Sequence, residues 1–183
     1  CIRDRGYTIR MKVLHQGGSI KVGHQQITVE GADEATVFYT VDTEYSSVYP
    51  LYKGEKPRQT TEKTIKSAIT KGYETVKHTH ISDYQTLYNR VKFTLSGDTA
   101  SEKLPTDIRV KQLQQGFTDD ASLKVLWFNL SRYLLISASR PGTLPSNLQG
   151  VWNTFEKAPW NGNFQSNINL QEMYWGCGPT QLP

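Results

Sequence analysis

The sequence has few of the features that mark several classes of protein. It has two cysteines, Cys1 and Cys177, at opposite ends of its 183 residues, so neither a disulfide framework nor a metal-spaced cysteine pair is predicted. No apolar run approaches the ~20 residues that a membrane helix needs, and the first residues lack the apolar stretch of a signal peptide. Because the chain does not begin with Met, we expect a processed or cut chain.

Charge of one sign is also not concentrated anywhere. The chain carries 21 basic and 17 acidic residues, a net charge of +4, and neither sign forms runs typical of nucleic-acid arms or polybasic membrane patches. We therefore expect no nucleic-acid partner and no membrane span. With 37% hydrophobic and 21% charged residues, the chain lies in the ordinary globular range and can bury a core.

The beginning of the chain has the pattern of β-strands. From Tyr7 to Leu14 the side chains alternate strictly, with Ile9, Met11 and Val13 on one face, which is typical of a half-buried strand. Similar stretches follow at 19–22, 26–30 and 35–41, separated by turns that contain glycine. The pattern predicts a β meander up to about residue 45.

Helical patterns begin after a linker with proline and glycine at 49–58. Thr61 is expected to cap the first helix, with Glu62 in its first turn, and Gly72 is expected to end it. A second helix is predicted from Tyr73, because apolar and aromatic residues recur every three or four positions, and Gly97 is its expected end.

The next predicted helix is apolar almost all round. Asp119 or Asp120 is expected to cap it, and only Lys124, Asn129 and Arg132 interrupt its apolar pattern. Such a helix is buried on several sides, so we expect it to pack inside a larger helical body. In isolation its exposed apolar face would favour self-association.

A long irregular segment follows at 141–166. Connections of this length usually either carry function or are disordered, and its four aromatic residues argue against disorder. Carboxamides alternate with Trp152 and Trp160, at positions Asn147, Gln149, Asn153, Asn161, Asn163 and Gln165. Carboxamides suit sugar hydroxyls and indoles suit the C–H face of a pyranose, although aromatics that pin a loop to a core would give the same composition.

Asn167 and Asn169 open a short helical pattern. Residues two apart on a regular helix point in nearly opposite directions, so both can face one pocket only if Asn167 lies outside the helix. An extended Ser166, or a cap at or near Asn167, would meet this condition. A purely structural capping role for Asn167 is the alternative.

A resemblance to glycoside hydrolase family 95 runs through nearly the whole chain. It is carried by residues 139–153, by Pro159 and Trp160, and by Asn167 to Gln171 with Tyr174 and Trp175; residues 80–91, 104–107 and 31–34 resemble other parts of the family. The resemblance implies an α+β fold: the end of an antiparallel β-sandwich at 1–48, a helical linker at 49–118 and the first helices of an (α/α)6 barrel at 119–183.

The resemblance also implies an activity. Members remove terminal α-1,2-linked L-fucose, or in some cases L-galactose, with inversion. The residues matching Asn167 and Asn169 position and activate water in them, and Gln165, Trp152 and Trp160 are expected to contact substrate. We expect a fucosylated oligosaccharide or glycan as partner, no cofactor, no metal, and an exported parent protein in the periplasm or outside the cell.

One departure from the family pattern and one missing pair of residues bear on this expectation. Fucosidases resembling this chain commonly have His where Gln165 stands, so an α-L-galactoside is an alternative substrate. The family's general acid and base lie beyond Trp175, and the acids after Asp120 are Glu156 and Glu172 alone, which we expect to be solvated charges. An inactive carbohydrate-binding or structural module is therefore the alternative for this chain by itself.

Overall fold

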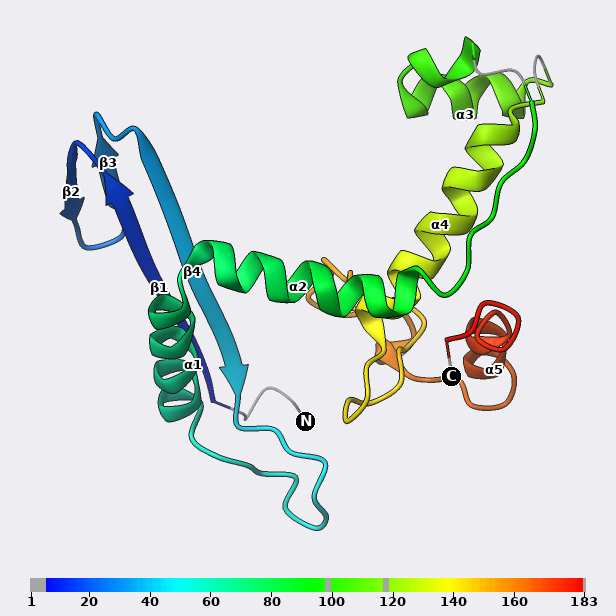
Figure 1. Ribbon diagram of the computed structural model, residues 1–183. Helices are drawn as coiled ribbons and strands as arrows, with labels where there is room; N and C mark the ends of the chain where they lie inside the picture. The colour runs from blue at the N-terminus through cyan, green and yellow to red at the C-terminus, as the bar shows by residue number, and fades with distance from the viewer. Residues whose placement is uncertain (1–5, 98–99, 117–118, 183) are drawn as a thin grey trace. The chain divides into compact units, whose positions relative to one another are not determined.

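The protein is described from a computed structural model that covers residues 6–97, 100–116 and 119–182 (Figure 1). Two compact units make up the chain, the first ending at His80 and the second beginning at Ile81. Antiparallel strands come first and helices follow, which confirms the α+β class. Cys1 and the domain boundary expected at residue 118 lie outside the described residues.

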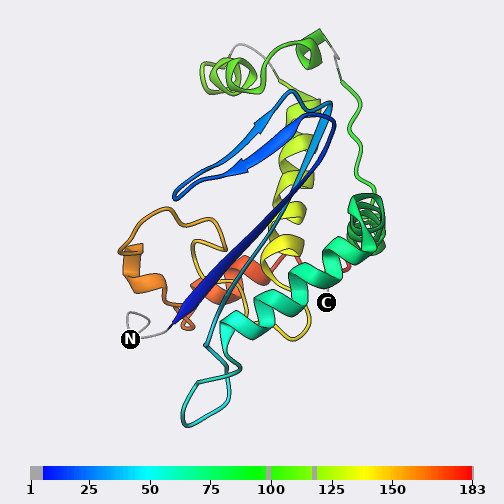
Figure 2. The same ribbon diagram turned by 90° about the vertical axis from the view of Figure 1, so that its left-hand side faces the viewer.

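The four predicted strands are present as two antiparallel pairs. β1 (Tyr7–Gln16) pairs along its whole length with β4 (Glu34–Thr43), and β2 (Ser19–Val22) pairs with β3 (Ile27–Glu30). Figures 1 and 2 show β1 and β4 as one long ribbon. The turn between β1 and β2 requires glycine, because Gly18 has a φ of 62° and a Cβ there would lie 2.2 Å from the carbonyl oxygen of Glu30.

The two faces of the β1–β4 ribbon differ in what covers them. On one face the cross-strand pairs Ile9–Val41 and Met11–Tyr39 are apolar, yet Ile9 is 62% and Tyr39 71% exposed. The opposite face, which carries Arg10, contacts α1 (Pro57–Lys71). In the described residues, the apolar face is therefore the more open one.

The first helix begins earlier than its predicted cap at Thr61. Pro57 occupies its first turn, where a missing N–H costs nothing. Thr61 is fully buried inside the helix, and its hydroxyl donates to the carbonyl oxygen of Pro57 at 2.7 Å. The prediction was wrong because a threonine hydroxyl can bond the preceding turn as readily as it can cap a helix.

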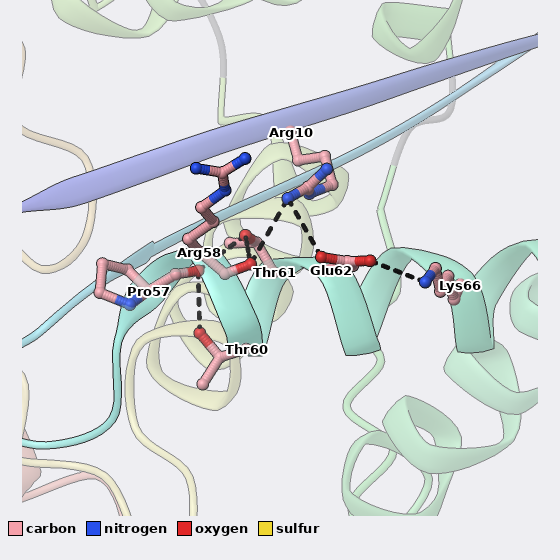
Figure 3. A network of polar contacts seen from close by, with 7 residues as sticks. All are labelled: Arg10, Pro57, Arg58, Thr60, Thr61, Glu62 and Lys66. Carbon is pink, nitrogen blue, oxygen red and sulfur yellow. Dashed lines mark hydrogen bonds and ion pairs between the residues drawn. The ribbon is translucent and has the colours of Figure 1, made fainter.

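Polar contacts join α1 to β1 (Figure 3). Arg10 donates through Nη2 to the carbonyl oxygen of Arg58 at 3.4 Å, and the same nitrogen lies 3.7 Å from a carboxylate oxygen of Glu62. Lys66, one turn further along, donates to Glu62 at 2.7 Å. The hydrogen bond and charge of Lys66, with a smaller contribution from Arg10, hold the pKa of Glu62 below its ordinary value.

Gly72 ends α1 as predicted, with a φ of 78°. α2 (Tyr73–Tyr88) then begins at once, but it ends well before Gly97. Its last carbonyls, those of Leu87 and Tyr88, accept hydrogen bonds from Arg132 at 3.1 and 2.8 Å. Because a side chain satisfies these carbonyls, the backbone does not need a further helical turn to do so.

A buried ion pair connects the next two helices. A short 3₁₀ helix (Ala100–Lys103) precedes α3 (Thr106–Gln114), and Asp120 caps α4 (Ala121–Ala138) by accepting from the Leu123 amide at 2.9 Å. Arg109 of α3 donates to both oxygens of the same carboxylate, at 2.8 and 2.9 Å. These bonds hold the pKa of Asp120 well below its ordinary value, against the effect of burial.

α4 is less covered than its sequence predicts. Leu123 and Ile136 are buried, whereas Trp127 is 67% and Leu130 48% exposed. An apolar strip of α4 thus faces solvent within the described chain. Arg132, which was expected only to interrupt the apolar pattern, is 3% exposed. None of the helices in the described ranges combines the length and hydropathy needed to cross a bilayer.

Candidate functional site

The irregular stretch at 139–168, which joins α4 to α5 (Asn169–Tyr174), is held together by its own carboxamides. Asn147 donates to the carbonyl oxygen of Gly162 at 3.2 Å, and Gln149 donates to that of Pro159 at 3.1 Å. Both acceptors belong to a short 3₁₀ turn, Pro159–Gly162. These two carboxamides therefore shape the 139–168 segment, a structural use of the kind that the composition of the segment also allowed.

The two tryptophans of the segment differ in their surroundings. Trp152 is 48% exposed and lines a cavity of about 280 Å³ together with Met173 of α5. Trp160 is 69% exposed and has a φ of 49°. Left-handed backbone is costly for a residue with a Cβ, so the surrounding turn must hold Trp160 in place. Its open indole is available to a ligand.

The two asparagines lie on either side of the start of α5. Asn169 is the first residue of the helix and is half-buried, whereas Asn167 is exposed and lies outside the helix, which meets the condition for both to face one pocket. The capping position belongs to Ile168, which has no side-chain acceptor, so Asn167 is not the cap. Neither carboxamide has a hydrogen-bond partner among the residues that the structure describes.

Gln165 precedes the asparagines in a strained turn. Its φ is 52°, and its side chain is half-buried. The carbonyl oxygen of Gln165 accepts from the Leu170 amide at 3.3 Å, and Gln171 donates to the carbonyl oxygen of Ser166 at 2.7 Å. The first turn of α5 is thus bonded to the chain that leads into it. No hydrogen bond within the described residues joins Gln165 to Trp160 or to either asparagine side chain.

Tyr174 joins α5 to both ends of a loop in the same unit. Its hydroxyl donates to Oγ of Ser139 at 2.8 Å and accepts from the backbone amide of Ser146, also at 2.8 Å. Ser139 is the residue that ends α4, and Ser146 is 6% exposed. The sequence pattern included Tyr174 but gave no sign of this bridge, because the partners lie about thirty residues away along the chain.

Arg132 bonds backbone carbonyl oxygens from separate segments of the second unit. Besides the carbonyls of Leu87 and Tyr88, its guanidinium lies 3.3 Å from the carbonyl oxygen of Val91 and 3.5 Å from that of Thr180. The guanidinium carbon also lies 5.2 Å from the ring centroid of Tyr88, a cation–π distance. A charged residue in the middle of an otherwise apolar stretch of α4 was the signal in the sequence, since a buried arginine is rarely without partners.

A cavity of about 690 Å³ lies beside this region. The ion pair between Arg140 and Asp83 lines it, as do Ser139, Tyr174 and Cys177. Burial raises the pKa of the Cys177 thiol. Neither asparagine lines this cavity, so it is separate from the residues predicted to hold water.

The acidic residues of the region are exposed. Glu156 and Glu172 both face solvent, and neither has an ion pair with another described residue. No group of three or more histidine, cysteine, aspartate or glutamate side chains in the described ranges is arranged to hold a metal ion. The exposed side chains of this region therefore include these two carboxylates as well as carboxamides and indoles.

The comparisons with known proteins all indicate the same family. The family model described as "Glycosyl hydrolase family 95 catalytic domain" matches residues 72–183, which include α2 to α5 and the 139–168 segment. Alpha-L-fucosidase 2 of Arabidopsis thaliana is 35% identical over 178 residues, 95% of this chain and 21% of the relative.

Two fungal relatives agree with this match. Probable alpha-fucosidase A of Aspergillus niger is 35% identical over 159 residues, 84% of this chain and 20% of the relative. Its namesake in Aspergillus oryzae is 36% identical over 146 residues, 78% of this chain and 19% of the relative. The chain spans about a fifth of the length of these relatives. Because the family match covers residues 72–183 and relatives of this identity cover most of the chain, the chain belongs to glycosyl hydrolase family 95.

Proposed function

We propose that the chain is part of a glycoside hydrolase that removes terminal α-1,2-linked L-fucose from oligosaccharides or glycans with inversion. The observation that carries the proposal is the family match over residues 72–183, because this range includes Asn167, Asn169 and the exposed Trp160. The names of the relatives, all alpha-fucosidases, support L-fucose as the sugar.

In this proposal Asn167 and Asn169 hold and orient the attacking water. A carboxamide offers one acceptor and two donor hydrogens, and neither side chain is engaged within the described chain. Asn167 lies outside α5 while Asn169 begins it, so the two are not fixed to the diverging directions of a regular helix.

Trp152, Trp160 and Gln165 would contact the sugar. The exposed indole of Trp160 can cover an apolar pyranose face. Inversion needs two carboxyl groups about 6.5–9.5 Å apart, to leave room for water. We propose that they come from further parts of the full-length protein.

The test uses the full-length protein with 2′-fucosyllactose as substrate. We expect release of L-fucose whose first-formed anomer, followed by NMR, is β. Asn167→Ala should lower kcat by about 100-fold or more and leave the melting temperature unchanged. Asn89→Ala, which removes an exposed carboxamide at the end of α2, is the matched control and should leave kcat unchanged. If the wild-type protein releases nothing from α-linked L-sugars, the proposal is wrong.

Gln165 favours a second candidate, an α-L-galactosidase. L-Galactose carries a hydroxyl at C6 that L-fucose lacks, and a carboxamide can bond it. The measurement is the ratio of kcat/KM for paired α-L-galactoside and α-L-fucoside substrates. If Gln165 sets the preference, Gln165→His should shift the ratio toward the fucoside by about 10-fold or more. An unchanged ratio would remove Gln165 from the argument.

A further inference from the structure

The stretch that carries the asparagines has few polar contacts with the rest of its unit. We consider residues 164–177, which include α5 and both asparagines. The hydrogen bonds of this stretch are local, reaching no further than residue 182, with two exceptions in the described chain. Both exceptions are made by the hydroxyl of Tyr174, to Ser139 and to the Ser146 amide.

A short helix needs such an anchor. α5 has six residues and no side-chain cap, and isolated helices of this length are not stable in water, because nucleation is unfavourable. Met173 of the helix lines a cavity that Trp152 also lines, but apolar burial there would not be directional. The hydroxyl bonds of Tyr174 therefore fix the orientation of the helix relative to the end of α4.

We propose that Tyr174 is a positioning residue that sets where Asn167 and Asn169 stand, by bonding α5 to Ser139 and to the Ser146 amide at once. The inference rests on the proposed function of the two asparagines. Tyr174 need not touch substrate. It acts through the helix whose first residue is Asn169 and whose last residue is Tyr174 itself.

The distance along α5 from Tyr174 to Asn169 is short, so a change in the orientation of the helix would displace the asparagine. Asn169 and Tyr174 are five residues apart, which is about 7.5 Å along a helix. A tilt of α5 by several degrees would therefore move Asn169 by a substantial fraction of an ångström. Misplacing a catalytic group by about 1 Å can cost about 100-fold in rate. Loss of the hydroxyl is thus expected to affect turnover more than stability.

The first experiment measures amide hydrogen exchange in the 183-residue chain. The Ser146 amide has the Tyr174 hydroxyl as its hydrogen-bond acceptor, so it reports on the bridge directly. Tyr174→Phe should speed its exchange by about tenfold or more. The Leu123 amide, which is bonded to Asp120 instead, should be unaffected. Equal Ser146 exchange in the variant and the wild type would overturn the proposal.

The second experiment measures kinetics in the full-length enzyme. Tyr174→Phe should lower kcat by about 10- to 100-fold with KM within about twofold, since sugar contacts outside α5 are unchanged. Tyr133→Phe is the matched control: it removes a tyrosine hydroxyl that has no hydrogen bond within the described residues, and kcat should stay at the wild-type value.

Serine substitutions separate the two halves of the bridge. Ser139→Ala removes one partner of the hydroxyl and should lower kcat in part, and Ser139→Thr should restore it because the hydroxyl returns. Ser146→Ala keeps the backbone amide that Tyr174 accepts from, so it should leave kcat near the wild-type value. A wild-type kcat for Tyr174→Phe refutes the positioning role alone. An inactive wild-type enzyme refutes the proposed function instead.

Discussion

Asp120 combines two stabilising contacts in one carboxylate, and replacing it by alanine should destabilise the second unit strongly. The carboxylate caps α4 through the Leu123 amide and accepts two hydrogen bonds from Arg109. A fourth bond comes from the hydroxyl of Ser122 at 3.1 Å. The Asp120 side chain is 1% exposed and that of Arg109 8%, so water does not replace the lost partner.

The expected loss can be worked out from these contacts. Removing a helix cap costs about 0.5–2 kcal/mol, and removing one partner of a buried ion pair costs about 3–5 kcal/mol because the other charge is left uncompensated. The two contributions share one carboxylate and do not add fully. We therefore expect Asp120→Ala to lower the free energy of unfolding by about 3–5 kcal/mol.

Urea unfolding followed by circular dichroism would measure this loss. For a slope of about 1.5 kcal/mol per M, the midpoint should fall by about 2–3 M. Asp119→Ala is the matched control: the neighbouring carboxylate is 81% exposed, and its pair with Lys124 should contribute less than about 1 kcal/mol. Replacing Arg109 by leucine as well should recover part of the loss. Equal midpoints for the two aspartate variants would refute the reasoning.

Three other predictions concern pH, the ends of helices and association. Folding lowers the pKa of Asp120, so the stabilisation that its carboxylate provides is present above its unfolded pKa of about 3.9 and is lost as the pH falls below that value. The difference in stability between wild type and Asp120→Ala should therefore be constant from pH 5 to 8 and shrink below pH 4. A constant difference down to pH 2 would contradict this prediction. Arg132→Leu leaves buried carbonyls without donors and should lower the free energy of unfolding by about 2–3 kcal/mol. Arg90→Leu, at an exposed site, should lower it by less than about 1 kcal/mol, and urea midpoints would compare the two variants. Light scattering should show association of the isolated chain through the open face of α4, weakened by Leu130→Lys, whereas a compact monomer would argue against it.

The sequence predicted the elements whose cause is local. The β1–β4 ribbon follows from strict alternation, and Gly72 ends α1 because glycine tolerates positive φ. Asp120, one of the two predicted caps, caps α4 because a carboxylate at that position has backbone amides within reach. For the asparagines, the two-residue spacing required Asn167 to lie outside α5 if both side chains were to face one pocket, and Asn167 does lie outside the helix. Each of these inferences depends on neighbours within a few residues.

The parts that were wrong or missed depend on distant partners. α2 ends early because Arg132, more than forty residues later, satisfies its last carbonyls. The carboxamides of Asn147 and Gln149 bond a turn that the sequence does not place beside them. The bridge of Tyr174 likewise has no periodic signature. The roles of Asn167, Asn169, Gln165, Trp152 and Trp160 remain proposals.

The open apolar face of the β1–β4 ribbon has a practical consequence for handling the chain. Since α1 contacts the opposite face, the side chains of Ile9, Tyr39 and Val41 can be exchanged for threonine or lysine without removing a contact to that helix. Polar residues at such positions discourage edge and face pairing between molecules. The same three sites therefore offer a route to more concentrated solutions for spectroscopy and crystallisation, with the residues of the candidate site left as they are.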